Sequence, residues 1–167
     1  MSMLTTVEAG IVSLAGTTTF TLTGGQSGYA KIQSGALKDV TDSIPCLTVD
    51  ILKSTSKHDG SGGTIGWKIR ELHTFRLMSY VSYADATTAE KDILIIRDAI
   101  IPIFQQSVRL GNLAIGGTLP DVPNVYASLV QENSEQYFYR DMFNGVIYRS
   151  HMFLLSVRCE YTLVLAQ

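Results

Sequence analysis

The chain has 167 residues, of which 46% are apolar and 17% charged, and its formal net charge is −2. This length suits one domain with one hydrophobic core, and the apolar content excludes disorder over most of the chain. Because the charged fraction is well below the quarter that is typical of globular proteins, we expect apolar or hydroxyl-rich surface that either stays exposed or is covered by another chain, which mildly favours an oligomer.

Charge and apolar runs exclude further classes of protein. The sequence has no cluster of Lys and Arg, which disfavours tight nucleic-acid binding. No run approaches the ~20 apolar residues that span a bilayer, and residues 1–16 lack the basic start of a signal peptide, so we expect a cytosolic protein. Cys46 and Cys159 lie in apolar contexts without CxxC spacing, which favours two buried free thiols over a disulfide or a metal site.

The first elements expected are a short helix and a hairpin. Apolar residues recur at helical spacing at Leu4, Val7, Ile11 and Leu14. Thr5 and Glu8 have the spacing of a capping box, and Gly16 is suited to the end of the helix. Residues 17–23 alternate hydroxyl and apolar side chains before two glycines, which predicts a strand and a tight turn, with residues 29–32 as the pairing partner.

Two strands and a loop are expected in the centre of the chain. Residues 44–53 alternate as in a strand, and the polar, glycine-rich stretch that follows predicts a flexible loop at residues 53–66. Residues 67–83 resume β alternation over an unusually long strand. Glu71 and His73 interrupt its apolar face, so we expect a β-bulge or the end of pairing there.

The main helix is expected to follow. Thr87 and Glu90 form a second capping-box pattern. Apolar residues then repeat every three or four positions, at Ala89, Ile93, Ile96, Ile100 and Phe104. Pro102 removes the helical hydrogen bond to the carbonyl of Asp98, so we expect a kink near Asp98.

The C-terminal third predicts a long loop and three strands. Glycines and prolines mark residues 111–124 as a loop, and its length favours a binding role. Residues 125–130 and 136–140 predict strands, and an Asn-Gly pair predicts a turn before the final strand at residues 153–165. That strand either offers an edge to another copy of the chain or pairs inside the fold.

These elements predict an α+β fold in a single domain, residues 1–167. A mixed, mostly antiparallel β-sheet packs against one main helix and a short N-terminal helix, with loops at residues 53–66 and 111–124.

A search for catalytic motifs gives no nucleophile elbow, P-loop, dinucleotide-binding fingerprint or zinc signature. His58, His73 and His151 lack the helical spacing of a metal-binding pair, so surface or hydrogen-bonded histidines are favoured. The glycines of residues 59–63 suit an anion-binding nest, but the segment leads into a strand and not a helix, which favours a hairpin loop. We therefore predict no catalytic, cofactor-binding or metal-binding residues, and no enzyme.

Two further clusters have a structural interpretation that we favour. Carboxylates around the main helix are typical of charge near a helix N-terminus; they are Asp85, Glu90, Asp92 and Asp98. An aromatic run suits core packing better than an interface; it comprises Tyr137, Phe138, Tyr139, Phe143 and Tyr148.

Residues 44–165 resemble the tail-terminator and head-to-tail joining proteins of long-tailed bacteriophages. The resemblance rests on the order of four segments: RELHTFRLMSYVSY, TTAEKDILIIRDAIIPIF, GNLAIGGTLPDVP and VIYRSHMFLLSVRCEY. They give a long strand, a capped helix, a Gly/Pro loop and strands. Residues 17–42 fit this pattern least well.

The resemblance implies an α+β subunit of a six-membered ring in the virion tail, assembled in the host cytoplasm. Its partners would be the tail tube protein and the head connector, and DNA would pass through without specific binding. The two long loops are the expected contacts between subunits or to the tube, through Lys57, His58, Asp59, Gly62, Leu113, Ile115, Leu119 and Asp121. The alternatives are another head-completion or tail-tube protein, or a small-molecule binding domain or enzyme.

Overall fold

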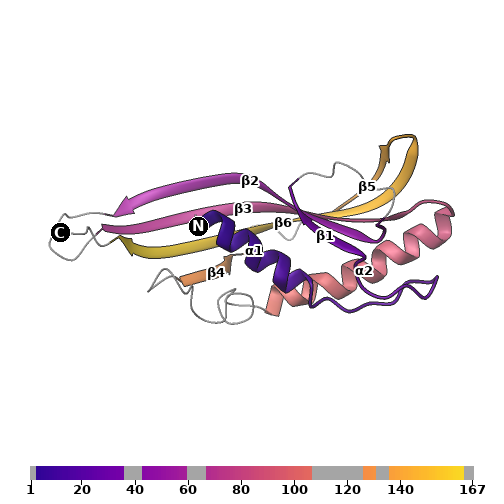
Figure 1. The fold of residues 1–167 in the computed structure, drawn as a ribbon, viewed down its shortest axis with the longest axis horizontal. Coiled ribbons are helices and arrows are strands. Elements are labelled where there is room, and N and C mark those ends of the chain that lie inside the picture. Colours follow the sequence, from indigo (N-terminus) through magenta and orange to yellow (C-terminus); the bar gives the residue numbers. More distant parts are fainter. Residues whose placement is uncertain (1–2, 36–42, 60–66, 107–125, 131–135, 164–167) are drawn as a thin grey trace.

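A computed structural model describes residues 3–35, 43–59, 67–106, 126–130 and 136–163 (Figure 1). These residues form two helices and six strands joined in one mixed sheet, so the predicted α+β class is confirmed. The elements are α1 (Met3–Ala15), β1 (Lys31–Ser34), β2 (Cys46–Asp59), β3 (Trp67–Ser82), α2 (Ala86–Gln106), β4 (Tyr126–Val130), β5 (Gln136–Phe143) and β6 (Val146–Leu163).

Three long antiparallel strands, β2, β3 and β6, form the centre of the sheet (Figure 1). The short strand β1 pairs in parallel with the start of β2. On the other side of β6, β5 pairs with residues 146–153 and β4 with residues 156–160. One margin of the sheet is therefore β1 and β2, and the other is β5 and β4.

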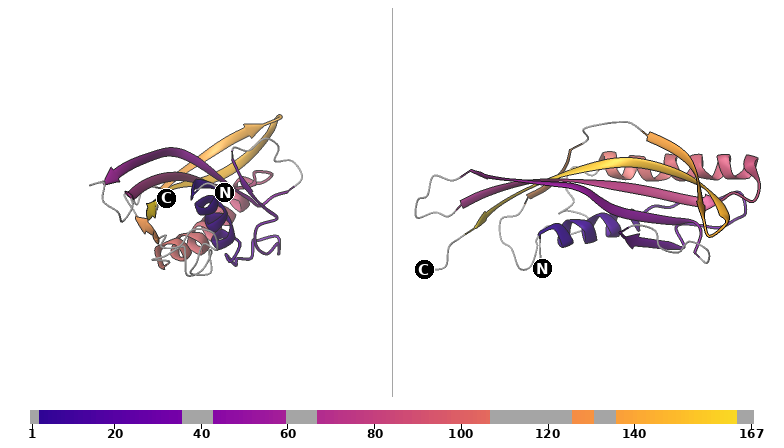
Figure 2. Two further views of the ribbon diagram at one scale, coloured as in Figure 1. Left: turned by 60° about the vertical axis from the view of Figure 1, so that its left-hand side comes forward. Right: turned by 90° about the horizontal axis from the view of Figure 1, so that it is seen from above.

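Both helices pack on the same face of the sheet (Figure 2). Because strand side chains alternate between faces, the odd-numbered residues of β3 share this face with odd-numbered residues of β6. The core joins residues of α1, α2 and the central strands, among them Val7, Ile11, Val49, Phe75, Leu77, Ile100, Phe104 and Leu155. We call this the helix-side face and the opposite one the far face.

The N-terminal segment differs from the expectation in two ways. The helix already begins at Met3, so Thr5 lies inside its first turn and not at a cap, although the helix ends before Gly16 as predicted. The strand expected at residues 17–23 is reduced to a single bridge, Thr21 to Ser27. Positive φ angles at Gly25 and Gly28 reverse the chain within a few residues, and β1 then pairs with β2.

The predicted loop at residues 53–66 is wrong in its first half, because β2 continues to Asp59. Every residue from Lys53 to Asp59 pairs with β3. The bulge lies in β2, at Leu52, and β3 pairs continuously past Glu71 and His73. These two residues interrupt the apolar pattern because they belong to a polar cluster described below.

The N-cap of the main helix lies two residues before the predicted cap, Thr87. Asp85 is the N-cap, since its Oδ2 accepts a hydrogen bond of 2.7 Å from the backbone N–H of Thr88. The carboxylate of Glu90 instead pairs with Arg149 of β6: Nη2 of Arg149 donates a hydrogen bond of 3.0 Å to Oε2, and its Nε lies 2.9 Å from Oε1 without a hydrogen bond. The helix continues through Pro102 to Gln106.

The predicted C-terminal strands are present, and β5 and β6 are longer than expected. Asn144 and Gly145 join them with φ angles of 51° and 78°, as a type I′ turn requires. The last strand pairs inside the fold, with β3 on one side and β5 and β4 on the other. It therefore does not offer the edge that was one of the two alternatives.

Candidate functional site

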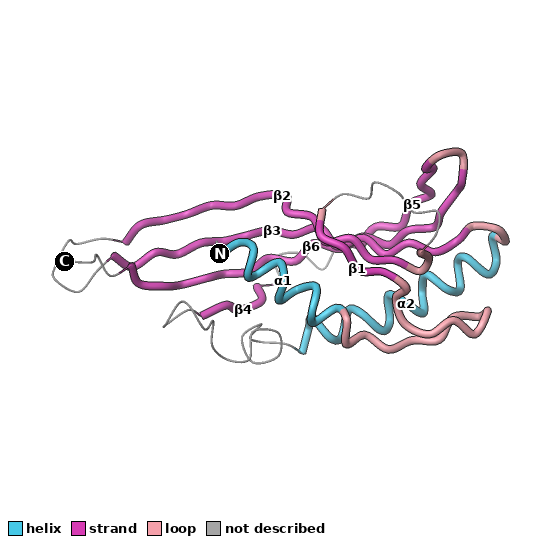
Figure 3. The backbone as a smooth tube through the Cα atoms, in the orientation of Figure 1, coloured by secondary structure: helices cyan, strands magenta, loops and turns pink. Residues whose placement is uncertain are grey.

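Beyond the bulge, the central strands continue as a three-stranded extension that we call the arm: residues 53–59, 67–74 and 156–163. The arm projects past the N-terminal end of α1 (Figure 3). Lys57 and His58, two of the predicted interface residues, are exposed side chains of the arm, and Asp59 is the last residue of β2. The other five, Gly62, Leu113, Ile115, Leu119 and Asp121, lie outside the described residues, as does the loop at residues 111–124.

The far face of the arm and its base carries a basic cluster. Rows of paired residues across β2, β3 and β6 are Asp50–Arg76–Leu154, Lys53–Thr74–Ser156, Thr55–Leu72–Arg158, Lys57–Arg70–Glu160 and Asp59–Lys68–Thr162. By this register, six cationic and three acidic residues share the face. The expectation that Lys and Arg do not cluster is wrong, because antiparallel pairing brings together residues that are up to 105 positions apart, such as Lys53 and Arg158.

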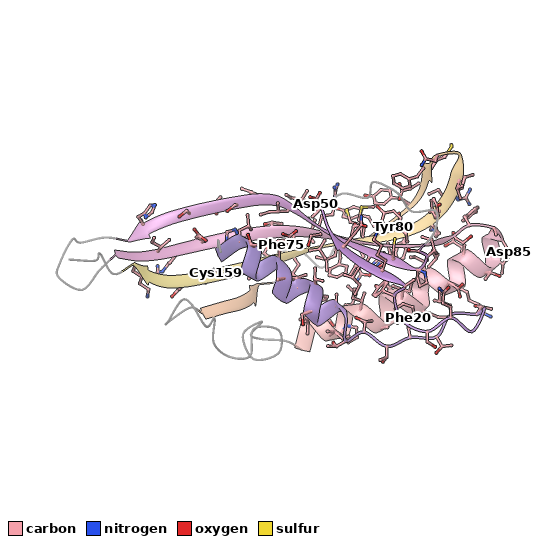
Figure 4. The ribbon with its side chains drawn as sticks, viewed as in Figure 1. Phe20, Asp50, Phe75, Tyr80, Asp85 and Cys159 are labelled. Carbon is pink, nitrogen blue, oxygen red and sulfur yellow. The ribbon has the colours of Figure 1, made fainter. Side chains whose placement is uncertain are left out.

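Asp50 and Glu160 form ion pairs with three of the six cationic residues. Asp50 binds Arg76 at 2.6 Å, and Glu160 binds Arg70 at 3.2 Å and Lys68 at 3.5 Å. The exposed side chains of Lys53, Lys57 and Arg158 form no ion pair with any described residue. Figure 4 shows side chains that end in nitrogen along the free end of the arm.

A groove of about 470 Å³ runs across the basic cluster. Its lining comprises Thr55, Lys57, Arg70, Glu71, Leu72, Arg158 and Glu160. It combines three cationic side chains with the carboxylates of Glu71 and Glu160, one hydroxyl group and one apolar side chain. This chemistry suits a charged, polar partner better than a small apolar ligand, because apolar and aromatic walls normally enclose such ligands.

The helix-side face of the arm carries a hydrogen-bonded polar chain around a buried histidine. The Oγ of Ser54 lies 2.8 Å from Nδ1 of His73, and Nε2 of His73 lies 3.1 Å from Oε2 of Glu71. The imidazole is 2% exposed, so these two contacts satisfy it inside the fold. Burial, with the charge of Glu71 as a second cause, raises the pKa of the neighbouring Cys159 thiol to about 12. That thiol is therefore protonated at neutral pH and a poor nucleophile.

A serine, a histidine and a carboxylate joined by hydrogen bonds in this order are also the components of a hydrolase triad. A hydrolase further needs hydrogen-bond donors for an oxyanion beside the nucleophile and a cleft that presents the substrate to it. Ser54 lies in a regular strand that pairs with His73, and the groove of the arm is lined mainly by side chains of the opposite face. The geometry favours a hydrogen-bonded structural cluster.

At the other end of the sheet, the β5–β6 hairpin exposes apolar side chains. Tyr137 and Tyr139 stack with ring centroids 6.2 Å apart and are 38% and 39% exposed, and Met142 is 68% exposed. Tyr148 is buried and Phe143 packs against Tyr80, so core packing is confirmed for part of the aromatic run only. The two exposed tyrosines form a separate surface feature.

The arm has one further property, which concerns its backbone. Gly35 donates from its backbone N–H to the carbonyl of Val49 at 2.7 Å, and past this point β2 has no second pairing partner among the described strands. On the opposite side of the arm, β4 pairs with β6 and has no second pairing partner among the described strands. Two strand edges therefore flank the arm on opposite sides of one sheet.

Cys46 and Cys159 are buried free thiols, as predicted. Among the described residues, three or more potential metal ligands of the His, Cys, Asp or Glu type do not come together. Neither described helix has the length and apolar character to cross a membrane. Comparison with protein families finds no family model that matches this sequence, and comparison with curated proteins finds no significant relative.

Proposed function

We propose that this chain is a structural virion protein, a tail terminator that forms a six-membered ring, caps the tail tube of a long-tailed phage and joins it to the head connector. The observation that carries the proposal is the pair of strand edges that flank the arm, one on β2 and one on β4. In this account the chain works by assembly and catalyses no reaction.

The two edges support a ring because they are different surfaces on opposite sides of one sheet. An unpaired edge accepts a further strand through its backbone N–H and C=O groups. When the β2 edge of one subunit meets the β4 edge of the next, the contact is head-to-tail, and repeated head-to-tail contacts close into a ring or continue as a filament. A terminator requires the closed ring.

The composition of the β2 edge agrees with this use. The exposed segment after the bulge is polar, KSTSKHD, and has no proline that would prevent strand addition. A hydroxyl-rich edge remains soluble before assembly and still offers its backbone groups. Lys57 and His58 belong to this strand and not to a loop, and in the proposed ring they take part in the subunit contact.

Substitution of Ser56 tests the β2 edge. The backbone groups of successive strand residues point alternately toward and away from the neighbouring strand. The Val49 carbonyl faces away from β3, and the extra residue at the bulge shifts the alternation by one position. The N–H of Ser56 therefore also faces away from β3. Ser56→Pro removes this N–H without removing a hydrogen bond to β3. We expect native mass spectrometry to find rings for the natural chain and for Ser56→Ala, but monomers for Ser56→Pro.

A natural chain that stays monomeric, both alone and with a tail tube protein, contradicts the proposal. Long tubes or fibres in electron micrographs would favour the tail-tube alternative instead. Circular dichroism of Ser56→Pro distinguishes a lost contact from a lost fold.

A hydrolase is the second candidate, and the chain of Ser54, His73 and Glu71 is the observation that favours it. A fluorophosphonate probe, which labels activated serines, tests it directly. We expect no labelling of the natural chain. Labelling that disappears in Ser54→Ala and in His73→Gln, but not in Ser56→Ala, would replace the structural proposal with an enzymatic one.

A further inference from the structure

The far face of the arm has a charge opposite in sign to that of the whole chain. The chain has a net charge of −2, yet six of its 13 Lys and Arg residues gather on this face beside three acidic residues, Asp50, Asp59 and Glu160. Adjacent rows are about 7 Å apart along the strands and the strands about 5 Å apart, so the cations cover a stripe about 10 Å wide and 27 Å long.

We propose that this stripe binds double-helical nucleic acid through its phosphates. Lys53, Lys57 and Arg158 carry the contact, since they are exposed and form no ion pair with a described residue. The hydroxyl groups of Thr55 and Thr74 lie between them. The Thr55 hydroxyl donates to the Leu72 carbonyl at 3.4 Å, whereas the Thr74 and Ser156 hydroxyls share one hydrogen bond of 3.3 Å, which leaves one of their two protons for a phosphate oxygen. The proposal concerns side chains of the far face, so it does not depend on the backbone edges that carry ring assembly.

The composition of the stripe favours phosphates over bases. Single-stranded nucleic acid is normally held by aromatic side chains on which bases stack. Residues 50–58, 68–76 and 154–160 present no aromatic side chain on the far face. A rigid, regularly spaced set of cations without stacking groups fits the backbone of a duplex, and it reads no sequence.

The strength of the contact follows from its charge. The excess of three positive charges, from six cationic and three acidic residues, predicts a salt dependence with a log–log slope of about −2.7. This slope is equivalent to an affinity loss of about 40-fold between ~50 and ~200 mM salt. The negative charge of the rest of the chain weakens the interaction further. One subunit therefore binds weakly, and a ring presents several such stripes at once.

Fluorescence anisotropy of a labelled DNA duplex with the full chain tests this proposal. The test variant is Lys57→Gln/Arg158→Gln, and the matched control is Lys91→Gln/Arg97→Gln on α2, which removes the same charge far from the arm. We expect the test variant to lose affinity at least about tenfold at low salt and its salt slope to fall by about 2, while the control stays within about threefold.

Three results would overturn the inference. They are no binding of the duplex at low salt, an equal loss in the two double variants, and tighter binding to polyglutamate than to a duplex of equal charge. The last would assign the stripe to an acidic protein partner. Native mass spectrometry of both variants separates loss of duplex binding from loss of ring assembly.

Discussion

His151 of β6 is a titratable side chain that the fold holds among aromatic rings, with its Nε2 3.2 Å from Oε1 of Gln136. Its ring stacks near Phe153 and Phe138, with centroid distances of 5.7 and 5.1 Å, and the side chain is fully buried. Burial lowers its pKa to about 4, and Arg97 adds to this effect while Asp98 opposes it. The folded protein therefore keeps this imidazole neutral at a pH at which the unfolded chain binds a proton.

The free energy of unfolding should fall as the pH decreases through this window. Because the pKa is about 6.5 in the unfolded chain and about 4 in the folded one, the loss begins near pH 6.5 and amounts to about 2 kcal/mol between pH 7 and pH 5. Urea unfolding at the two pH values measures it, and His151→Phe should remove most of this loss. The exposed His58 provides the control His58→Gln. An equal pH dependence in His151→Phe and the natural chain contradicts this assignment.

At the scale of the elements, apolar periodicity predicts the helices and strands that have a buried face. It misses the second half of β2, residues 53–59, which is polar on both faces. The helices and β6 follow their repeats because tertiary packing selects the same face that the sequence marks. Residues 53–59 carry no such mark, since both faces are polar, and only pairing with β3 shows them to be a strand. The sequence did show polar side chains at every second position, Lys53, Thr55 and Lys57, which would share one face of a strand. This pattern predicts a polar face only if the segment is already known to be a strand.

The β5–β6 hairpin permits a test of turn geometry. Gly145 has a φ of 78°, a backbone conformation in which a residue with a side chain is strained. Gly24 has no positive φ, and a Cβ atom added there would meet open space. We expect Gly145→Ala to reduce stability by about 1–2 kcal/mol and Gly24→Ala to leave it unchanged or raise it by about 0.5 kcal/mol. Chemical denaturation compares the two. A similar effect of both substitutions would contradict the type I′ turn.

At the scale of the whole molecule, one end of the sheet combines three features. The arm carries the basic stripe on its far face, the Ser54–His73–Glu71 chain on its helix-side face, and a strand edge on each side. The sequence predicted a role for this region through Lys57, His58 and Asp59 but not its shape. The basic stripe depends on the pairing of β2, β3 and β6, which are far apart in the sequence, so no local pattern reveals it.

Cross-linking between subunits tests the head-to-tail contact most directly. Two single substitutions, Ser56→Cys on β2 and Ala127→Cys on β4, introduce a cysteine at a helix-side position of each strand, while the native cysteines are buried. Mixing the two variants with a short bismaleimide should give dimers that join residue 56 of one subunit to residue 127 of another. Ser56→Cys alone should give none. Links between two copies of residue 56, or no links in the mixture, would contradict assembly through these two edges.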